Sequence, residues 1–209
     1  MKLIAEGAEA KIYLENDLII KERIPKDYRI KTIDDSLRKS RTRKELKILD
    51  KASNIINVPK LHSSSSEKDF KIVMEFIDGK KLAESLDSFS DKERVSICHE
   101  VGKQAAIMHN NNIIHGDLTT SNMILKNNKV FFIDFGLGFI SDQIEHKAVD
   151  LHLIEQALES KHYTHFKSSF NAVIESYKKN SDKSKDILDR LSKVEGRGRY
   201  KSKNKLKKE

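Results

Sequence analysis

The chain has 209 residues and a mass of 24.1 kDa, enough for one large domain or two small lobes with a packed core. Hydrophobic residues make up 37% and charged residues 34%, which is typical of a globular protein with a strongly charged surface. No apolar run reaches the roughly 18 residues of a membrane helix, and the single cysteine, Cys98, excludes an intramolecular disulfide framework. We therefore expect a protein of a reducing compartment, the cytoplasm.

The first part of the chain is expected to form a small sheet with one helix. Short apolar runs separated by turn residues predict the strands. A charged helix is predicted because Glu45 shares one face with three apolar residues at i+3, i+4 and i+7. Glu45 should therefore lie beside the packed side of that helix. The expected elements are strands at residues 3–5, 12–14, 18–21 and 70–76 and a helix at about residues 34–53.

The pattern changes near Asp78-Gly79, where we place a lobe boundary. Ser90 with Glu93 forms a capping-box pattern that predicts a helix start, and Cys98 lies in the apolar stripe of that helix. A hairpin is expected at residues 123–133, and helices from about residue 148 onward. Strands early and helices late predict an α+β protein. The expected parts are an N-lobe (1–77), a C-lobe (78–195) and a basic tail (196–209).

The net charge of +8 is unevenly distributed. The tail of residues 196–209 contains seven Lys or Arg and one acid, a charge of +6, so the first 195 residues carry only +2. A second basic cluster spans Arg38–Lys47, where six of ten residues are Lys or Arg. Both segments could attract nucleic acid, although a solvated helix face and a disordered tail explain the same pattern. The histidines show no metal pattern, and His162 with His165 is expected to be a surface pair.

The strongest signal is a pair of motifs, His115-Gly116-Asp117-x4-Asn122 followed by Asp134-Phe135-Gly136. Phosphoryl transfer needs a carboxylate that orients the attacking hydroxyl, and oxygen ligands for the Mg²⁺ on the phosphates. Asp117 fits the first role, and Asn122 and Asp134 fit the second because Mg²⁺ prefers hard oxygen ligands. Either motif alone could be an ordinary loop. Together and in this order they resemble the protein-kinase signature set and predict a bilobal kinase-like fold that binds ATP and Mg²⁺.

Kinases place a lysine and a glutamate upstream, and both are present. Lys21 ends a predicted strand, and Glu45 follows twenty-four residues later on the predicted helix. An ammonium held by a carboxylate is a positioned charge for phosphate oxygens. Taken singly, an exposed lysine and a surface glutamate would explain these residues. The ordered four-part pattern favours the catalytic interpretation.

The glycine-rich loop of kinases is reduced here to residues 6–10. The small residues Gly7, Ala8 and Ala10 still let backbone N–H groups approach phosphates. Glu9 would lie close to the anionic phosphates, which is unusual for an ATP site. We expect all four to contact the nucleotide, although an ordinary hairpin turn fits the same residues.

Three residues of the last N-lobe strand lie where a kinase places its gatekeeper and adenine-binding hinge. They are Met74, Glu75 and Ile77, and backbone groups of the last two are expected to hydrogen-bond adenine. A simple strand end would look the same. Asp150 is expected to anchor the catalytic loop from a buried helix, as an aspartate does in kinases, although a helix-surface acid fits equally.

Several parts of a conventional protein kinase are missing. No proline follows Pro59, so there is no Ala-Pro-Glu element, and thirteen residues separate Gly136 from Asp150. Thr119 stands where conventional Ser/Thr kinases carry a lysine. The sequence therefore predicts a minimal kinase core with a very short activation segment.

The combined motifs resemble the small atypical kinase of the KEOPS (EKC) complex in its single-domain archaeal form. The resemblance covers nearly the whole chain, and Asp27 departs from the usual pattern. The segments that carry it are 7–10, 23–29, Arg41-x-Arg43-x-Glu45, 115–122, 133–137 and Arg197-Gly198-Arg199.

This resemblance implies an autophosphorylating Ser/Thr kinase or ATPase that works with a threonylcarbamoyl-transferase subunit and a small accessory subunit. That assembly makes threonylcarbamoyladenosine in ANN-decoding tRNAs. The short activation segment would leave the peptide-docking region free for a protein partner. The tail of residues 196–209 would extend toward the partner or tRNA, and Arg38–Lys47 is a second candidate tRNA contact.

Two other interpretations remain open at this point. A small-molecule kinase of the aminoglycoside or choline type also uses His-Gly-Asp followed by Asn, but it usually carries a helical acceptor-binding insertion that this chain has no room for after Asp134. A non-catalytic scaffold or RNA-binding module is the other, and the complete set of expected catalytic residues argues against a dead site.

Overall fold

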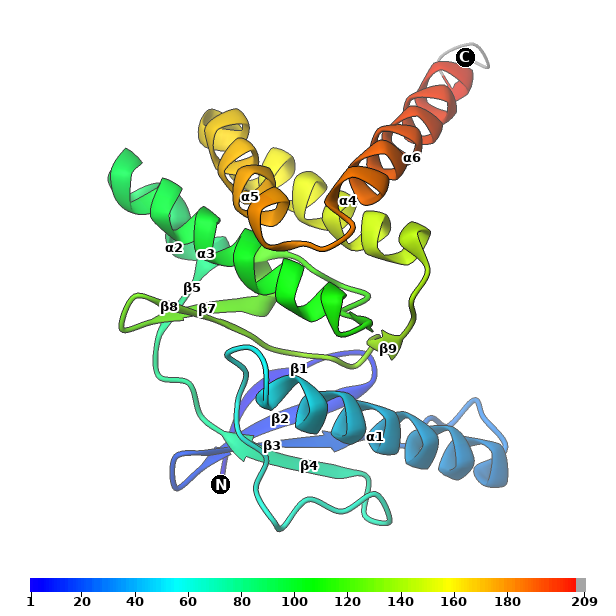
Figure 1. The fold of residues 1–209 in the computed structure, drawn as a ribbon. Coiled ribbons are helices and arrows are strands. Elements are labelled where there is room, and N and C mark those ends of the chain that lie inside the picture. Colours follow the sequence, from blue (N-terminus) through cyan, green and yellow to red (C-terminus); the bar gives the residue numbers. More distant parts are fainter. Residues whose placement is uncertain (206–209) are drawn as a thin grey trace.

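The N-lobe is a four-stranded antiparallel sheet with one long helix beside it, in the lower half of Figure 1. The computed structural model describes residues 1–205, and side chains up to Gly196. The strands follow one another in the sheet in the order of the sequence, because each connection is a hairpin or a return through the helix. The elements of this lobe are β1 (Lys2–Glu6), β2 (Ala10–Glu15), β3 (Leu18–Arg23), α1 (Lys31–Ser53) and β4 (Lys71–Glu75).

Two local features set the geometry of this lobe. Asn16 and Asp17 both have positive φ angles, 49° and 59°, which gives the tight turn between β2 and β3. Helix α1 begins at Lys31, three residues before the expected start near residue 34. The N–H groups of Ile33 and Asp34 both donate to the carbonyl of Ile30, at 3.0 and 2.9 Å, so the first helical turn is already closed there.

The C-lobe is mainly helical, and its short strands lie in the segments that connect the helices (Figure 1). The capping box predicted at Ser90 and Glu93 is present at the start of α3. Short 3₁₀ turns occur at Leu86–Ser88, Thr120–Asn122 and Tyr163–His165. The other elements are β5 (Lys80–Lys81), α2 (Leu82–Ser85), α3 (Asp91–Asn110), β6 (Ile113–Ile114), β7 (Met123–Lys126), β8 (Lys129–Phe132), β9 (Phe139–Ile140), α4 (Ile144–Lys161), α5 (Phe166–Asn180) and α6 (Ser184–Lys205).

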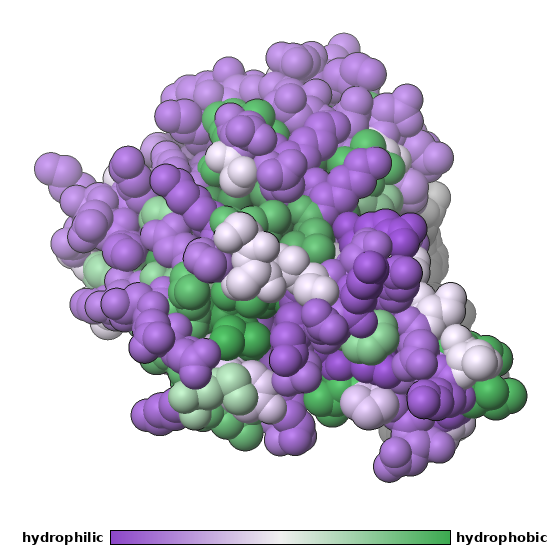
Figure 2. Space-filling view, turned by 90° about the horizontal axis from the view of Figure 1, so that it is seen from below, coloured by the Kyte–Doolittle hydropathy of each residue, from purple (hydrophilic) through white to green (hydrophobic). Residues whose placement is uncertain are grey.

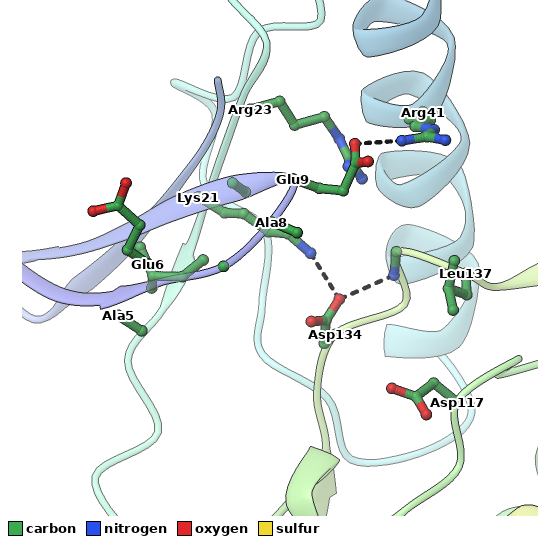
Figure 3. A pocket seen from close by; sticks show the side chains of 14 residues that line it. Ala5, Glu6, Ala8, Glu9, Lys21, Arg23, Arg41, Asp117, Asp134 and Leu137 are labelled. Atoms are coloured by element: carbon green, nitrogen blue, oxygen red, sulfur yellow. Dashed lines mark hydrogen bonds and ion pairs between the residues drawn. The ribbon is translucent and has the colours of Figure 1, made fainter. Parts of the chain in front are cut away.

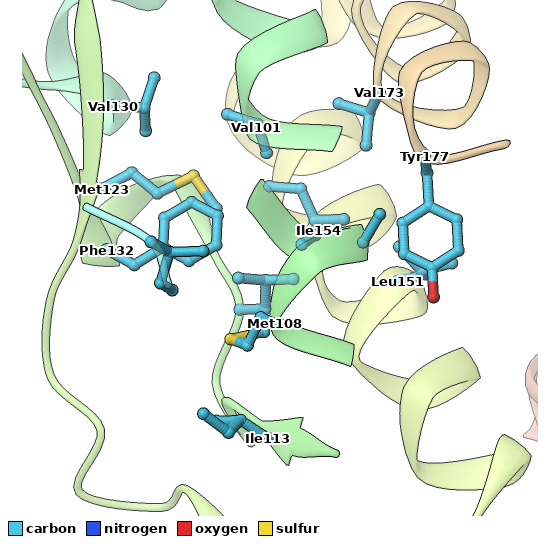
Figure 4. Close-up of a cluster of buried hydrophobic side chains, with 14 of the residues drawn as sticks. Val101, Met108, Ile113, Met123, Val130, Phe132, Leu151, Ile154, Val173 and Tyr177 are labelled. Atoms are coloured by element: carbon cyan, nitrogen blue, oxygen red, sulfur yellow. The ribbon is translucent and has the colours of Figure 1, made fainter. Parts of the chain in front are cut away.

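The hydrophobic core lies between the hairpin β7–β8 and helices α3, α4 and α5, as Figure 4 shows. Helices α3 and α5 approach closely at Gly102, where an added Cβ would meet the carbonyl oxygen of Val173 at 2.1 Å. Cys98 is buried in this core, and burial raises the pKa of its thiol to about 11. Its predicted packing role is confirmed, and its thiol is not an activated nucleophile.

The last helix runs across the boundary that we placed between residues 195 and 196. Helix α6 spans Ser184–Lys205 without a break, and the remaining residues of the tail, 206–209, lie outside the described residues. Among residues 1–205, no helix is both long and apolar enough to cross a lipid bilayer. The face of the molecule in Figure 2 is mostly hydrophilic, with separate hydrophobic patches between the charged residues.

Candidate active site

Four charged side chains from β3, α1 and the segment after β8 meet inside the cleft between the lobes. The ammonium of Lys21 on β3 lies 2.6 Å from the Glu45 carboxylate on α1 and 2.7 Å from the Asp134 carboxylate. The second oxygen of Glu45 accepts a hydrogen bond of 2.5 Å from Arg23. Lys21 and Arg23 are two residues apart on one strand, so they point to the same face. The predicted lysine–glutamate pair is present, and Arg23 is an additional member.

The ion pairs set the protonation of these groups. Burial alone would lower the pKa of Lys21, but the charges of Glu45 and Asp134 outweigh it and raise that pKa. Burial would raise the pKa of Asp134, but the Lys21 charge and hydrogen bonds from Lys21 and Gly136 lower it. Lys21 is therefore a cation and Asp134 an anion at neutral pH. The Asp134 side chain is still 53% exposed, which leaves it accessible to a ligand.

The backbone around Asp134 is constrained. Asp134 has a φ angle of +62°, a left-handed conformation that is uncommon for residues other than glycine, asparagine and aspartate. At the next but one residue, Gly136, a side chain would crowd the charged groups of the site. A Cβ there would lie 3.0 Å from the Asp134 carboxylate and 3.3 Å from the Lys21 ammonium. The glycine of the Asp-Phe-Gly motif therefore permits the contact between Lys21 and Asp134.

The catalytic loop places Asp117 and Asn122 side by side. The amide nitrogen of Asn122 donates to the carboxylate and to the carbonyl oxygen of Asp117, both at 2.9 Å. Because the nitrogen makes both bonds, the amide oxygen of Asn122 remains for a cation. Gly116 has a φ angle of +77°, and a Cβ there would meet the carbonyl of Leu137 at 2.4 Å. Glycine is needed at that position, where the loop packs against the segment after Asp134.

Asp150 anchors this loop from α4, which is one of the two roles that the sequence left open for it. Its carboxylate accepts the backbone N–H groups of His115 at 2.6 Å and Gly116 at 2.9 Å. It also lies 3.3 Å from Nε2 of His109, whose Nδ1 lies 2.8 Å from the Tyr177 hydroxyl. A carboxylate can only accept, so the proton of His109 is on Nε2 and the hydroxyl of Tyr177 donates to Nδ1. All three side chains are fully buried.

His115 links the catalytic loop to the Asp-Phe-Gly motif. Its Nε2 lies 3.1 Å from the carbonyl oxygen of Ile133, and its Nδ1 accepts the backbone N–H of Asp117 at 3.3 Å. Its ring lies 4.6 Å from the ring of Phe135, which is 1% exposed. Burial lowers the pKa of His115, so the ring is neutral and both nitrogens have a partner.

The loop between β1 and β2 covers the outer end of the cleft. Gly7 and Ala8 are exposed in this loop, whereas Ala10 is 7% exposed and pairs with Arg23, and the N–H of Gly7 donates to the carbonyl of Ala10 at 3.0 Å. The Glu9 carboxylate is bound by Arg41 of α1 (Figure 3). It also lies 3.5 Å from Arg29. Burial would raise the pKa of Glu9, but hydrogen bonds and charges from Arg41 and Arg29 lower it. Glu9 seemed unsuited to a phosphate site, but its negative charge is balanced by the positive charges of two arginines.

Two cavities share the cleft, on either side of Lys21 and Asp134. The inner one has about 430 Å³ and is lined by Met74, Glu75 and Ile77 at one end and by Asn122 and Asp134 at the other. The outer one has about 520 Å³ and lies under the β1–β2 loop. It is lined by Lys21, Asp134 and Asp117 and by residues of the loop, among them Gly7, Ala8, Glu9 and Ala10. Small-molecule sites commonly have the volume of the inner cavity.

The predicted hinge forms part of the inner cavity. The N–H of Glu75 donates to the carbonyl of Lys60 at 2.9 Å, so the carbonyl is the backbone group of Glu75 that can meet a ligand. Ile77 is 3% exposed and closes this end of the cavity. The strand end therefore has the position that an adenine-binding hinge requires.

The donor set of the cleft fits a magnesium nucleotide. Asn122 and Asp134 offer hard oxygen atoms, and Lys21 offers a positioned cation for phosphates. No group of three His, Cys, Asp or Glu side chains that could hold a metal occurs in the described part of the chain. Two protein ligands without a closed cage suit Mg²⁺, which keeps waters and phosphate oxygens in its shell.

Two expectations about surface residues change in the structure. His162 is 1% exposed, with Nδ1 3.1 Å from Asp87 and Nε2 3.3 Å from the Thr120 hydroxyl, so the predicted surface pair with His165 is wrong. It packs behind the turn that precedes Asn122. Within Arg38–Lys47, the arginines Arg38, Arg41 and Arg43 all form ion pairs inside the N-lobe, with Asp34 and Asp35, Glu9 and Glu67 respectively.

Sequence reasoning missed several members of the site. Arg23 could have been found from its i, i+2 relation to Lys21, and Arg41 from its i, i+4 relation to Glu45, since both spacings share a face. His109 and Tyr177 carry no such signal, because they lie 68 residues apart and occupy positions in apolar helix faces.

Comparison with known proteins places the chain in a family. Residues 19–147 match the RIO domain family. The chain is 45% identical to the "KEOPS complex subunit Bud32" of Pyrococcus abyssi, over 98% of each protein. It is 39% identical to the "EKC/KEOPS complex subunit bud32" of Dictyostelium discoideum, over 96% of this chain and 83% of that protein.

A longer relative has the same region as one of its parts. The chain is 42% identical to a "Probable bifunctional tRNA threonylcarbamoyladenosine biosynthesis protein" of Methanobrevibacter smithii, and it spans 36% of that protein. The full-length matches confirm the resemblance and the kinase-like α+β fold predicted from the motifs. The chain belongs to the kinase-like RIO domain family and, within it, to the Bud32 family.

Proposed function

We propose that this protein is an ATP- and Mg²⁺-dependent phosphotransferase, acting as a Ser/Thr protein kinase or an ATPase. In the cell it would be the Bud32 subunit of a KEOPS complex that makes threonylcarbamoyladenosine in ANN-decoding tRNAs. The observation that carries the proposal is the convergence of Lys21, Glu45 and Asp134 at one cleft with Asp117 and Asn122. The names of the relatives support the assembly and the tRNA pathway.

The geometry suggests a division of roles among these residues. The bound metal–nucleotide supplies the transferable phosphoryl group and the charge neutralisation of its phosphates. Asn122 and Asp134 would hold that metal through their oxygens, and Lys21, positioned by Glu45, would contact the phosphates. Asp117 would orient the attacking hydroxyl or water and accept its proton. Such catalysis is mainly positioning and electrostatic stabilisation.

The alternative of a small-molecule kinase is less well supported. Only the short β9 and its flanking residues separate Asp134 from the start of α4 at Ile144, so no acceptor-binding insertion occurs there. The same shortness exposes Leu137, Phe139 and Ile140 beside the basic residues of α1. This apolar and basic surface is the proposed docking region for a partner subunit such as the transferase.

The catalytic role of Asp117 is tested by Asp117→Asn. The asparagine can still accept the hydrogen bond from Asn122, so the loop should keep its structure while the proton acceptor is lost. We expect ATP turnover to fall roughly 10²- to 10⁴-fold, with nucleotide affinity nearly unchanged in a fluorescent-nucleotide titration. Turnover at the parent rate would contradict the proposed role.

The same assay, repeated with the transferase subunit and tRNA, separates the two activities. Stimulated phosphate release without a phosphorylated protein product favours the ATPase. Incorporation of phosphate into a protein hydroxyl favours the kinase.

A contribution of α1 to tRNA binding is tested through its exposed lysines. Lys44 and Lys47 line the surface next to Phe139 together with Arg41, which is paired with Glu9. If each contacts a tRNA phosphate, the double alanine variant should reduce the slope of log affinity against log salt by about 1.4 to 1.8. Truncation at residue 196 gives the corresponding value for the tail. An unchanged slope removes the segment concerned from the tRNA contact.

A further inference from the structure

The outer cavity contains more positive groups than the contact with Asp134 requires. Besides Lys21, the cavity is lined by Arg23 and Arg41, which come from β3 and α1. Figure 3 shows both arginines with Glu9 at one end of the cavity, while Asp134 and Asp117 lie toward the other. The inner cavity, by contrast, contains the hinge and both expected metal ligands. The outer end is therefore a distinct, arginine-rich chamber.

One anion already occupies this chamber, and it belongs to the chain itself. The Glu9 carboxylate is bound by Arg41 and approached by Arg29. Arg29 is held from behind by Asp34, which is 2% exposed and 3.4 Å away. Arg29 is thus anchored by Asp34 and Arg41 is carried by helix α1, whereas Glu9 is carried by a loop with small neighbours. The carboxylate is the partner that can leave.

Arg23 provides an independent sign of an incompletely satisfied site. Its side chain is 5% exposed and one of its terminal nitrogens donates to Glu45, but its Nε is buried without a hydrogen-bond partner in the described residues. Buried N–H groups nearly always have a partner. Arg23 lines the chamber, so an oxygen-rich ligand there would supply one once the guanidinium turns toward the cavity.

A phosphate group suits these cations better than a carboxylate does. Arginine forks bind phosphate oxygens with two parallel hydrogen bonds, and a phosphate offers more acceptor oxygens and more charge than Glu9. We propose that Arg41 and Arg23 form a second anion subsite, which accepts a phosphate group when that group displaces the Glu9 carboxylate. The subsite rests on the proposed function for the source of its phosphate, either the terminal phosphate of bound nucleotide or free phosphate left by turnover.

Inorganic phosphate is the probe for this subsite, with binding measured by calorimetric titration of the full chain. In Glu9→Gln the tethered competitor loses its charge, so phosphate should bind about fivefold more tightly than to the parent. In the double variant Glu9→Gln with Arg41→Gln, that gain should be lost.

The pair Glu67 and Arg43 provides a matched control. Here too an arginine of α1 is paired with a glutamate outside that helix, but the pair lies outside the chamber, and Glu67→Gln changes the net charge by the same amount. Phosphate affinity should change less than twofold in this variant. Equal gains in the two glutamine variants, no gain in Glu9→Gln, or a gain that survives Arg41→Gln would each overturn the proposal.

Two nucleotide backgrounds identify the source of the phosphate. The titration is repeated with saturating Mg·ADP and with a magnesium complex of a non-hydrolysable ATP analogue. If the ATP analogue prevents phosphate binding and Mg·ADP does not, the subsite holds the terminal phosphate of bound nucleotide. If phosphate binds in the presence of either nucleotide, the subsite holds a separate phosphate. Because these titrations involve no turnover, an inactive protein that binds phosphate as described would contradict the proposed function and not the subsite.

Discussion

The two sides of the cleft position their functional groups by different means. On the N-lobe side, Lys21 is placed by ion pairs with Glu45 and Asp134, and Glu45 also holds Arg23. On the C-lobe side, the loop that carries Asp117 is fixed through its backbone, by hydrogen bonds to a carboxylate buried in α4. The first arrangement depends on the balance of charges. The arrangement on the C-lobe side depends on each buried polar group having a hydrogen-bond partner that is neutral or fixed in place.

This difference matters for ligand binding. Lys21 now bridges two carboxylates, and one of them, on Asp134, is half exposed and can exchange its partner for a cation. The backbone contacts of Asp150 are fully buried and need no rearrangement. We therefore expect a nucleotide to change the N-lobe side of the site and to find the catalytic loop already in place.

The largest loss of stability is expected from Glu45→Gln, on the N-lobe side of the cleft. The substitution leaves two buried cations, Lys21 and Arg23, without their shared anion. Removing one partner of a buried ion pair costs about 3–5 kcal/mol, and chemical denaturation should show a loss of that size. Glu67→Gln, which breaks an exposed pair with Arg43 of the same helix, should change stability by less than about 1 kcal/mol. Equal losses would mean that the burial of Glu45 has no energetic consequence.

An intermediate effect on stability is expected from lowering the pH, through His115 on the C-lobe side of the cleft. The pKa of His115 is lowered in the folded protein, while the unfolded chain has the ordinary value of about 6.5. Below that pH the unfolded chain binds a proton at His115 and the folded protein does not. The stability from neutral His115 is complete above about pH 6.5 and is lost as the pH falls, by about 1.4 kcal/mol per pH unit.

The pH prediction is checked by urea unfolding of the parent and of His115→Gln between pH 7 and pH 5. The variant should lose less stability than the parent over this interval. His62→Gln, which removes an exposed histidine, should follow the parent. Parallel curves for parent and His115→Gln would show that His115 is not the group that the folded state keeps neutral.

The smallest effect is expected from Tyr177→Phe, which removes only the hydroxyl behind His109. The ring still fills the core, but Nδ1 of His109 loses its donor. We expect a loss of about 1 kcal/mol in unfolding free energy and a lower kcat for ATP turnover with an unchanged KM, because His109 helps to hold Asp150. Tyr163→Phe, at an 81% exposed tyrosine, is the control. A change in KM alone would place the effect on nucleotide binding and not on the catalytic loop.

The sequence was sufficient for the parts of the fold that depend on local patterns. The meander before Lys21, the capping box at Ser90 and the hairpin after Asn122 were all predicted, because each is specified by residues close together in the chain. The motif order also predicted that Lys21 and Asp134 would meet, although 113 residues separate them.

Other features could not be predicted because they depend on which distant faces pack together. His162 has the spacing of a surface pair with His165, but the end of α4 turns it inward toward Thr120. Glu9 looked unsuited to a phosphate site until Arg41, 32 residues away, proved to face it. The basic cluster of α1 looked like a binding patch, and its arginines are instead used within the lobe. Charge patterns in a sequence do not distinguish an external partner from an internal one.

The short pairing of β6 with β9 has a pharmacological consequence. These strands flank the two motifs of the cleft, since β6 ends directly before His115 and β9 follows Gly138. Together with the fully packed ring of Phe135, they tie both motifs into one unit. An inhibitor that requires this phenylalanine to leave its pocket would therefore have to disturb the β6–β9 pairing, whereas a compound that fills the arginine-rich outer end of the cleft would leave it intact.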